Sequence, residues 1–178
     1  MGQLTFIVGG VRSGKSRFAE QLAAAHDSAV YLATAQPGDE EMARRIERHR
    51  QRRAKEVPGW RTIEEPWDIA ATLRSDHTTG CVLVECLTLW LTNRISGLGE
   101  RPPQTNEETL ADLDEFIATA RHGTSRVIVV SNEVGCGITP VNALARRFGD
   151  LLGEANQRLA AAANEVYACI AGIPMRIK

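Results

Sequence analysis

The chain has little excess charge of either sign and no long apolar run. Its 178 residues include 21 lysines and arginines and 22 aspartates and glutamates, for a formal net charge of −1 with histidine neutral. General nucleic-acid binders and membrane-surface binders depend on a strong basic excess, so this balance favours a small-molecule partner. No apolar run approaches the roughly 18 residues of a membrane-spanning helix. We therefore expect no nucleic-acid partner and no membrane insertion.

Cysteine is scarce and is not arranged in pairs. The four cysteines form no C-x-x-C pair and no zinc-like spacing with the four histidines. We expect reduced core thiols, which are typical of an intracellular protein. The N-terminal residues also lack the charged and apolar regions of a signal peptide, so the protein is expected to be soluble and cytoplasmic. The sequence contains no internal repeat, and its length suits a single domain spanning residues 1–178.

A glycine-rich motif lies near the start of the chain, where residues 8–20 read VGGVRSGKSRFAE. Four of its residues match the phosphate-binding pattern G-x-x-x-x-G-K-[ST]: Gly9, Gly14, Lys15 and Ser16. An apolar run at 4–8 predicts a strand before the loop and helical spacing predicts a helix after it, which argues against a chance glycine turn. Backbone N–H groups and the helix N-terminus of such a loop surround phosphates. The motif predicts a bound nucleotide, with Lys15 reaching its terminal phosphates and Ser16 binding Mg²⁺.

Strand and helix candidates alternate along the rest of the chain. The strand candidates are 4–8, 29–36, 81–85, 126–133 and 165–172, most of them continuous apolar runs typical of a covered parallel sheet. The helix candidates after the glycine-rich loop are 39–55, 87–95, 105–121 and 142–163. This order predicts a three-layer α/β domain with a mostly parallel sheet. Residues 173–178 follow their predecessor too closely for a crossover, so they are expected to form an antiparallel edge strand. The stretch at 60–63 is assigned no element, and 97–108 has a linker-like composition.

Glu85 is a candidate second magnesium anchor. A loop that holds a triphosphate usually works with an acidic residue at the end of a neighbouring buried strand. Glu85 ends the apolar run at 81–85 and meets this description. An acidic residue before a helix also stabilises that helix, so a capping role toward the segment from Leu87 is an alternative. Neither role excludes the other.

The charged helix predicted at 39–55 carries a histidine on its apolar side. Met42, Ile46 and His49 follow one another at spacings of four and three, which places them on one face amid arginines able to neutralise phosphate. The acidic start and basic end of this helix are what the helix dipole favours. From these residues alone, a packed core histidine is preferred over a nucleophile, because a nucleophile requires confirming geometry.

Seven segments, in this order, make the chain similar to a known family. They are GGVRSGKSRFAE from Gly9, YLATAQ from Tyr31, DEEMARRIERHR from Asp39, WRTIEEP from Trp60, LVECLTLWLTN from Leu83, SNEVGCGITP from Ser131 and RRFGDLLGEANQRLAAAANEV from Arg146. Over nearly its whole length the chain resembles the bifunctional adenosylcobinamide kinases and adenosylcobinamide-phosphate guanylyltransferases of cobalamin synthesis. The resemblance implies a P-loop NTPase fold of the RecA-like kind and a homotrimer.

The resemblance implies two reactions. ATP or GTP phosphorylates the hydroxyl of the aminopropanol arm of adenosylcobinamide, and GMP is then transferred from GTP to that phosphate to give adenosyl-GDP-cobinamide. In the family the histidine of an R-I-x-x-H motif, here His49, attacks the α-phosphate and carries GMP covalently. An imidazole is a competent nucleophile, and a covalent intermediate divides one transfer into two steps. The resemblance therefore reverses the preference for a core histidine.

The resemblance also implies the residues of the site. The catalytic residues are Lys15 and His49, and the magnesium ligands are Ser16 and Glu85. The implied nucleotide contacts are Gly9, Gly10, Val11, Arg12, Ser13, Gly14, Lys15, Ser16, Thr34, Ala35, Gln36, Arg50, Gln51, Arg52, Arg53, Glu64 and Glu85. The arginines would stabilise charge that develops on the phosphoryl oxygens. Glu64 would accept hydrogen bonds from guanine N1–H and the exocyclic amine, which distinguishes guanine from adenine.

Two other functions are alternatives at this point. A monofunctional P-loop kinase for another small metabolite needs the same loop and Glu85, but no covalent step and only a structural His49. A GTP-binding switch is disfavoured because the chain contains no Asn-Lys-x-Asp run, the usual guanine reader of such proteins. The sequence determines neither the preference for ATP or GTP in the kinase step nor the residues that contact the corrinoid.

Overall fold

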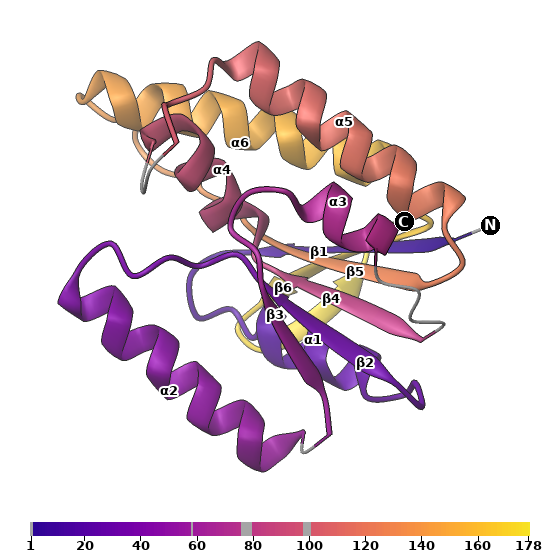
Figure 1. Cartoon of the computed structure of the whole chain (residues 1–178). Coiled ribbons are helices and arrows are strands. Elements are labelled where there is room, and N and C mark those ends of the chain that lie inside the picture. The colour runs from indigo at the N-terminus through magenta and orange to yellow at the C-terminus, as the bar shows by residue number, and fades with distance from the viewer. Residues whose placement is uncertain (1, 58, 76–79, 98–100) are drawn as a thin grey trace.

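The computed structural model describes residues 2–57, 59–75, 80–97 and 101–178, without the side chains of 45, 52, 54 and 56. A seven-stranded sheet lies at the centre of this part of the chain, with helices on both faces (Figure 1). The strands are β1 (Gln3–Gly9), β2 (Ala29–Ala33), β3 (Arg61–Glu64), β4 (Cys81–Glu85), β5 (Arg126–Asn132), β6 (Glu165–Ile170) and β7 (Ile173–Arg176). The helices are α1 (Lys15–Ala23), α2 (Glu40–Glu56), α3 (Ile69–Ser75), α4 (Leu87–Ser96), α5 (Asn106–His122) and α6 (Ala143–Ala162).

The sheet is parallel except at one edge. Its strand order is β3-β2-β4-β5-β1-β6-β7, and only the pairing of β6 with β7 is antiparallel among the described strands. The three-layer α/β domain and the antiparallel C-terminal strand are therefore confirmed. Because the other strands run the same way, β1, β2, β4 and β5 all end at the same edge of the sheet. Gly9, Ala33, Glu85 and Asn132 are their last residues.

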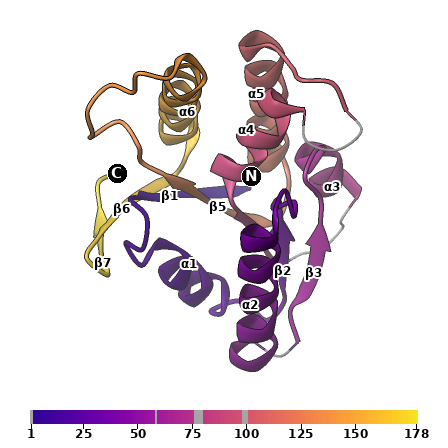
Figure 2. The ribbon, with the colours of Figure 1, turned by 90° about the vertical axis from the view of Figure 1, so that its left-hand side faces the viewer.

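Alternate residues of each strand enter two separate cores, as the two-residue period of a strand requires. Phe6, Val84 and Val129 pack on the face covered by α4, α5 and α6. Ile7 and Leu83 point the opposite way and pack with α1. Figure 2 shows α1 and α2 on one side of the sheet and α4, α5 and α6 on the other. Both faces are buried, which explains why the central strands read as continuous apolar runs.

Two elements were missed by the sequence analysis. The stretch at 60–63 is part of β3, a parallel edge strand whose residues are exposed or half-buried and so form no apolar run. Helix α3 has only seven residues, too few for a clear helical pattern. The segment 97–108 is also less of a linker than expected, because Thr105 and Glu108 form a capping box that begins α5.

The predicted ends of three strands and the predicted burial of one cysteine were wrong. β2 ends at Ala33 instead of residue 36, β5 ends at Asn132 and β6 ends at Ile170. Cys81, Cys86 and Cys169 are buried free thiols as expected, but Cys136 is exposed. In the described part of the chain, none of the helices has the length and apolar character needed to cross a membrane.

A buried arginine on α4 fixes the chain that follows β3. Arg94 is 6% exposed, and its guanidinium lies 2.9 Å from Asp112 Oδ2 and donates to the carbonyl oxygen of Trp67 at 2.7 Å. The indole N–H of Trp90 donates to the same carbonyl. The neighbouring Asn93 donates to the carbonyl oxygens of Thr34 and Pro66. Helix α4 thus holds the segments after both β2 and β3 in place.

Replacing Arg94 with alanine should lower the free energy of unfolding by about 3 kcal/mol, because it removes a buried ion pair and leaves polar groups unsatisfied. Arg74→Ala is the matched control, since it breaks an exposed ion pair with Glu115 and should change stability by less than about 1 kcal/mol. Urea unfolding followed by circular dichroism measures both. Equal losses in the two variants would show that the Arg94 contacts do not stabilise the fold.

Candidate functional site

The glycine-rich motif forms a tight loop between β1 and α1. Arg12 and Gly14 have left-handed backbones, with φ of 57° and 92°, and Gly14 is the N-cap of α1. A Cβ atom on Gly14 would lie 2.9 Å from the Cα atom of Gly172, so both the turn and the close approach require glycine. Lys15 is 8% exposed, and its ammonium donates to the carbonyl oxygen of Gly10 at 3.1 Å. The loop presents the start of a helix and a lysine at one place, which is the arrangement that binds phosphate.

A serine and a glutamate meet at the start of α1. The Ser16 hydroxyl donates to Glu85 Oε1 at 2.6 Å, although β4 and β1 are separated in the sheet by β5. Two oxygen ligands beside a phosphate loop fit Mg²⁺, which usually takes one or two protein ligands and completes its shell with phosphates and water. The residues that the structure describes contain no cluster of three or more metal-ligating side chains. The alternative role of Glu85 was to cap the helix that begins at Leu87. The N-cap residue of this helix, α4, is Cys86, and its side chain makes no capping hydrogen bond.

The segment after β2, where nucleotide contacts are expected at Thr34, Ala35 and Gln36, is tied to the end of β4. The fully buried Thr34 hydroxyl accepts from the Cys86 N–H and donates to the Cys86 carbonyl oxygen, both at 2.8 Å. It therefore ties β2 to β4 across the cis peptide bond between Glu85 and Cys86. Ala35 lines a cavity, whereas Gln36 lines neither of the two cavities described next.

Two cavities lie on either side of His49. One, of about 590 Å³, is bounded by the phosphate loop from Val11 onward and by α2. The other, of about 360 Å³, lies between α2 and the ends of β2, β3 and β4, with Tyr31 and Ile46 among its apolar walls. His49 lines both. The His49 side chain can therefore contact the middle of a ligand that extends from one cavity into the other.

The start of helix α2 is fixed by its N-cap residue, and its orientation is fixed by a stripe of apolar residues. Asp39 caps it by accepting from the Met42 N–H at 2.7 Å, so this residue precedes the first turn in which it was expected. Met42, Ile46 and His49 are half-buried and line the 360 Å³ cavity, so the predicted common face exists. This face carries the imidazole to the cavity edge instead of into a sealed core.

The sequence analysis missed three residues of α2 that face the phosphate loop. Glu41, Arg44 and Arg48 line the 590 Å³ cavity together with Lys15. Their spacings of three and four place them on one helix face. The same spacing argument that located His49 could have located them, but only the structure shows that this face is opposite the loop. The two arginines add positive charge where phosphates would bind.

The arginines and the glutamine at 50–53, all expected to contact the nucleotide, do not all face the same cavity. Arg50 forms an ion pair with Glu64. Arg53 is 8% exposed, and its guanidinium carbon lies 3.8 Å from the ring centroid of Tyr31. Gln51 donates to Glu47 and lines neither cavity. The Arg52 side chain lies outside the described residues. Arg50, Arg53, Glu64 and Glu85 all line the 360 Å³ cavity.

Two other ionisable groups in the 360 Å³ cavity stay uncharged. Burial, with a smaller contribution from Glu85, raises the pKa of the Cys86 thiol to about 11, so it is protonated near pH 7. A protonated thiol is a poor nucleophile. Burial also raises the pKa of the Tyr31 hydroxyl well above its ordinary value. Of the nucleophilic side chains that line this cavity, His49 also reaches the phosphate loop.

Comparisons with known proteins agree with this geometry. A family model described as cobinamide kinase / cobinamide phosphate guanyltransferase matches residues 5–177. The bifunctional adenosylcobalamin biosynthesis protein CobP of Pseudomonas aeruginosa is 48% identical over 174 residues, which are 97% of this chain and 95% of that protein. The proteins named CobU from Escherichia coli K12 and Salmonella typhimurium are 40% and 41% identical, over 98% of this chain and 99% of each relative.

The matches extend over nearly the whole of the chain, and the relatives are covered almost completely as well. The family resemblance inferred from the seven sequence segments is therefore confirmed. The phosphate loop, the buried strand ending in Glu85 and the helix that carries His49 all lie within the matched range. The chain belongs to the cobinamide kinase / cobinamide phosphate guanyltransferase family.

Proposed function

We propose that this protein phosphorylates adenosylcobinamide with ATP or GTP and then transfers GMP from GTP to adenosylcobinamide phosphate through a guanylyl-His49 intermediate. The product is adenosyl-GDP-cobinamide, in the nucleotide-loop part of cobalamin synthesis. The observation that carries the proposal is the position of His49 between the phosphate-loop cavity and the cavity lined by Glu64. Family membership supports both activities. We also propose that residues 1–178 act as one nucleotide-binding domain in the cytoplasm.

The kinase half relies on the phosphate loop. Lys15 turns its ammonium from the Gly10 carbonyl oxygen to the terminal phosphates, where it stabilises the charge of the transferred group. Ser16 and Glu85 are the residues that would hold Mg²⁺, which neutralises charge on the phosphates. Arg44 and Arg48 face the same cavity and add hydrogen-bond donors for phosphoryl oxygens.

In the transfer half one GTP spans both cavities. Its phosphates lie on the loop and its base enters the 360 Å³ cavity, so the α-phosphate lies at the junction beside His49. A ring nitrogen of His49 attacks the α-phosphorus, an N–P bond forms, the P–O bond to the β-phosphate breaks, and pyrophosphate leaves. A phosphate oxygen of adenosylcobinamide phosphate then attacks the same phosphorus and breaks the N–P bond. This second step regenerates the imidazole and leaves GMP joined to the phosphate of adenosylcobinamide phosphate.

The walls of the 360 Å³ cavity suit a purine. Tyr31, Met42 and Ile46 supply apolar surface, while Glu64 supplies two acceptor oxygens at the end of β3. Guanine presents two adjacent donors, N1–H and the exocyclic amine, and adenine does not. Glu64 is thus the residue that selects GTP in the transfer step. Arg53, stacked on Tyr31, stiffens the wall of the cavity.

His49→Ala should abolish GMP transfer and spare phosphorylation of adenosylcobinamide, because the imidazole is needed only as the nucleophile. Lys15→Ala should reduce both half-reactions by about a hundredfold or more, since one charge-stabilising donor contributes roughly 3 kcal/mol to lowering the barrier. Incubation with α-labelled GTP should leave an acid-labile, base-stable label on the wild-type protein and none on His49→Ala.

His122→Ala is the control for these variants, because His122 lies at the exposed end of α5 and should leave both activities unchanged. Absence of label on the wild-type protein, or equal labelling of His49→Ala, would overturn the guanylyl-histidine mechanism. A wild-type protein that phosphorylates but carries no label would instead be a monofunctional kinase.

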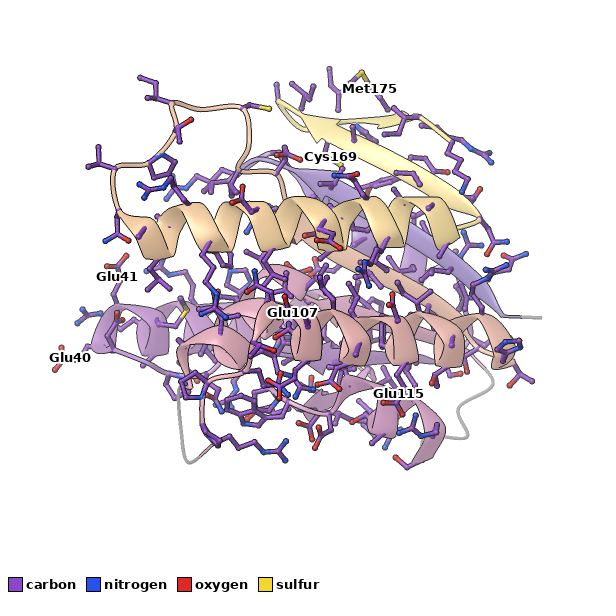
Figure 3. The ribbon with its side chains drawn as sticks, turned by 90° about the horizontal axis from the view of Figure 1, so that it is seen from above. Glu40, Glu41, Glu107, Glu115, Cys169 and Met175 are labelled. Atoms are coloured by element: carbon purple, nitrogen blue, oxygen red, sulfur yellow. The ribbon has the colours of Figure 1, made fainter. Side chains whose placement is uncertain are left out.

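We propose that the protein is a homotrimer assembled through one apolar edge. Large apolar side chains are exposed between β5 and the first turn of α6 and in the C-terminal residues from the end of β6 onward: Val134, Ile138, Val141, Leu144, Ile170, Ile173, Met175 and Ile177. Figure 3 shows Met175 at an edge of the molecule along which the segment between β5 and α6 also lies. Exposed large apolar side chains that gather along one edge are typical of interaction sites. Both segments contact the phosphate loop, through Glu133 N–H to Gly9 O and Gly172 N–H to Ser13 O.

Size-exclusion chromatography with light scattering should give the mass of three 19.5 kDa chains for the wild-type protein. The double change Ile173→Asp and Met175→Asp should give a monomer, because each introduces a charge into the apolar edge. Ala111→Asp, on the exposed side of α5, is the matched control and should keep the wild-type mass. A monomeric wild type, or a double variant of unchanged mass, would contradict this assembly.

A further inference from the structure

The residue that would read guanine already has a partner. Glu64 Oε1 accepts a hydrogen bond from the Arg50 guanidinium, and the two side chains form an ion pair between α2 and the end of β3. Both are about half exposed. Arg50, Arg53 and Glu64 line the 360 Å³ cavity and also a neighbouring cavity of about 500 Å³ bounded by Val57 and Trp60. The ion pair therefore stands between the two cavities, at the place where a base edge has to reach Glu64.

Recognition of guanine would use the same carboxylate as this ion pair. The two donors on the guanine edge take both carboxylate oxygens of Glu64, and Oε1 already accepts from Arg50, so guanine has to share that oxygen with the guanidinium. Hypoxanthine has only N1–H on that edge and can bond Oε2 while Arg50 stays in place. Adenine offers no such pair of donors. The number of donors on the base edge thus decides whether the base has to share Oε1 with Arg50.

We propose that guanine releases Arg50 from Glu64 and that the released guanidinium then serves the phosphoryl transfer at His49. This inference rests on the proposed function, because it assigns a consequence to base recognition in the same site. Arg50 follows His49 in the chain, and both side chains line the 360 Å³ cavity. Glu47 Oε2 lies 4.0 Å from Arg50 Nη1, so the displaced arginine keeps a carboxylate neighbour. Guanine recognition is coupled to charge stabilisation, and discrimination between bases appears in the rate of transfer.

Charge complementarity is the reason for the coupling. A guanidinium held by a carboxylate is largely neutralised, and it stabilises developing negative charge poorly. When the neutral base edge replaces it on Glu64, the guanidinium keeps only the more distant carboxylate of Glu47, and the donors released from Glu64 become available to the phosphoryl oxygens. A nucleotide with the wrong base leaves Arg50 in its ion pair, so its α-phosphate meets fewer available hydrogen-bond donors.

The binding test uses GDP, IDP and ADP, none of which carries the triphosphate, titrated calorimetrically into each variant. Arg50→Ala should bind GDP about threefold more tightly than the wild-type protein, since an exposed ion pair is weak but must be broken. IDP and ADP should bind both proteins equally. In a Glu64→Gln background the Arg50→Ala change should no longer affect GDP binding, which makes a double-mutant cycle. Weaker or unchanged GDP binding by Arg50→Ala would overturn the exchange.

The rate test compares the labelling of His49 by GTP and by ITP. In the wild-type protein GTP should label faster than ITP, and Arg50→Ala should slow GTP about a hundredfold and bring the two rates close together. Arg50→Lys should restore part of the GTP rate, because it restores the charge but not the planar fork. An Arg50→Ala variant that keeps the wild-type ratio of GTP to ITP labelling would overturn the catalytic role of Arg50.

Arg74→Ala is the matched control in both tests. It removes a similarly exposed arginine from an ion pair on α3, and should alter neither GDP affinity nor labelling. Failure of the proposed function has a different signature. A wild-type protein without label on His49 would overturn the guanylyl-histidine step, whereas the exchange would be contradicted by the GDP titrations.

Discussion

The hydrogen bond between Ser16 and Glu85 is the contact on which the arrangement of the site depends. It joins the first turn of α1 to the end of β4 at 2.6 Å, although these segments are 69 residues apart. Parallel pairing makes this possible, because β1, β5 and β4 end at the same edge of the sheet. Both side chains carry oxygen atoms of the kind that Mg²⁺ binds. The contact between α1 and β4 therefore lies at a place that suits a magnesium-bound phosphate.

Helix α2 lines both of the cavities that meet at His49. It has few apolar residues, and one stripe of them sets its orientation over the ends of β2 and β4. The remaining faces are then free to carry charge toward two different cavities. Arg44 and Arg48 face the phosphate loop, while Arg50 and Arg53 line the 360 Å³ cavity. In the proposed function, this single helix contacts both ends of one nucleotide, with His49 between them.

Polar residues at the ends of strands and helices do most of the positioning. Thr34 joins the ends of β2 and β4, and Asn93 holds the segments that follow β2 and β3. These contacts lie beneath the cavity walls and take no direct part in the proposed chemistry. They explain why a residue expected to contact the nucleotide, Thr34, is instead fully buried with its hydroxyl satisfied by the backbone of Cys86.

The sequence by itself determined the central strands, the phosphate loop, the acidic start of the helix at 39–55 and the common face of Met42, Ile46 and His49. Each of these depends on neighbours within a few residues, where spacing and residue type carry the physics. Only the tertiary structure decided that β3 is a strand, that Arg50 pairs with Glu64 and that Arg44 and Arg48 face the loop. These features depend on contacts between segments far apart in the chain, and the exposed charged residues that make them have no local pattern to reveal their partners.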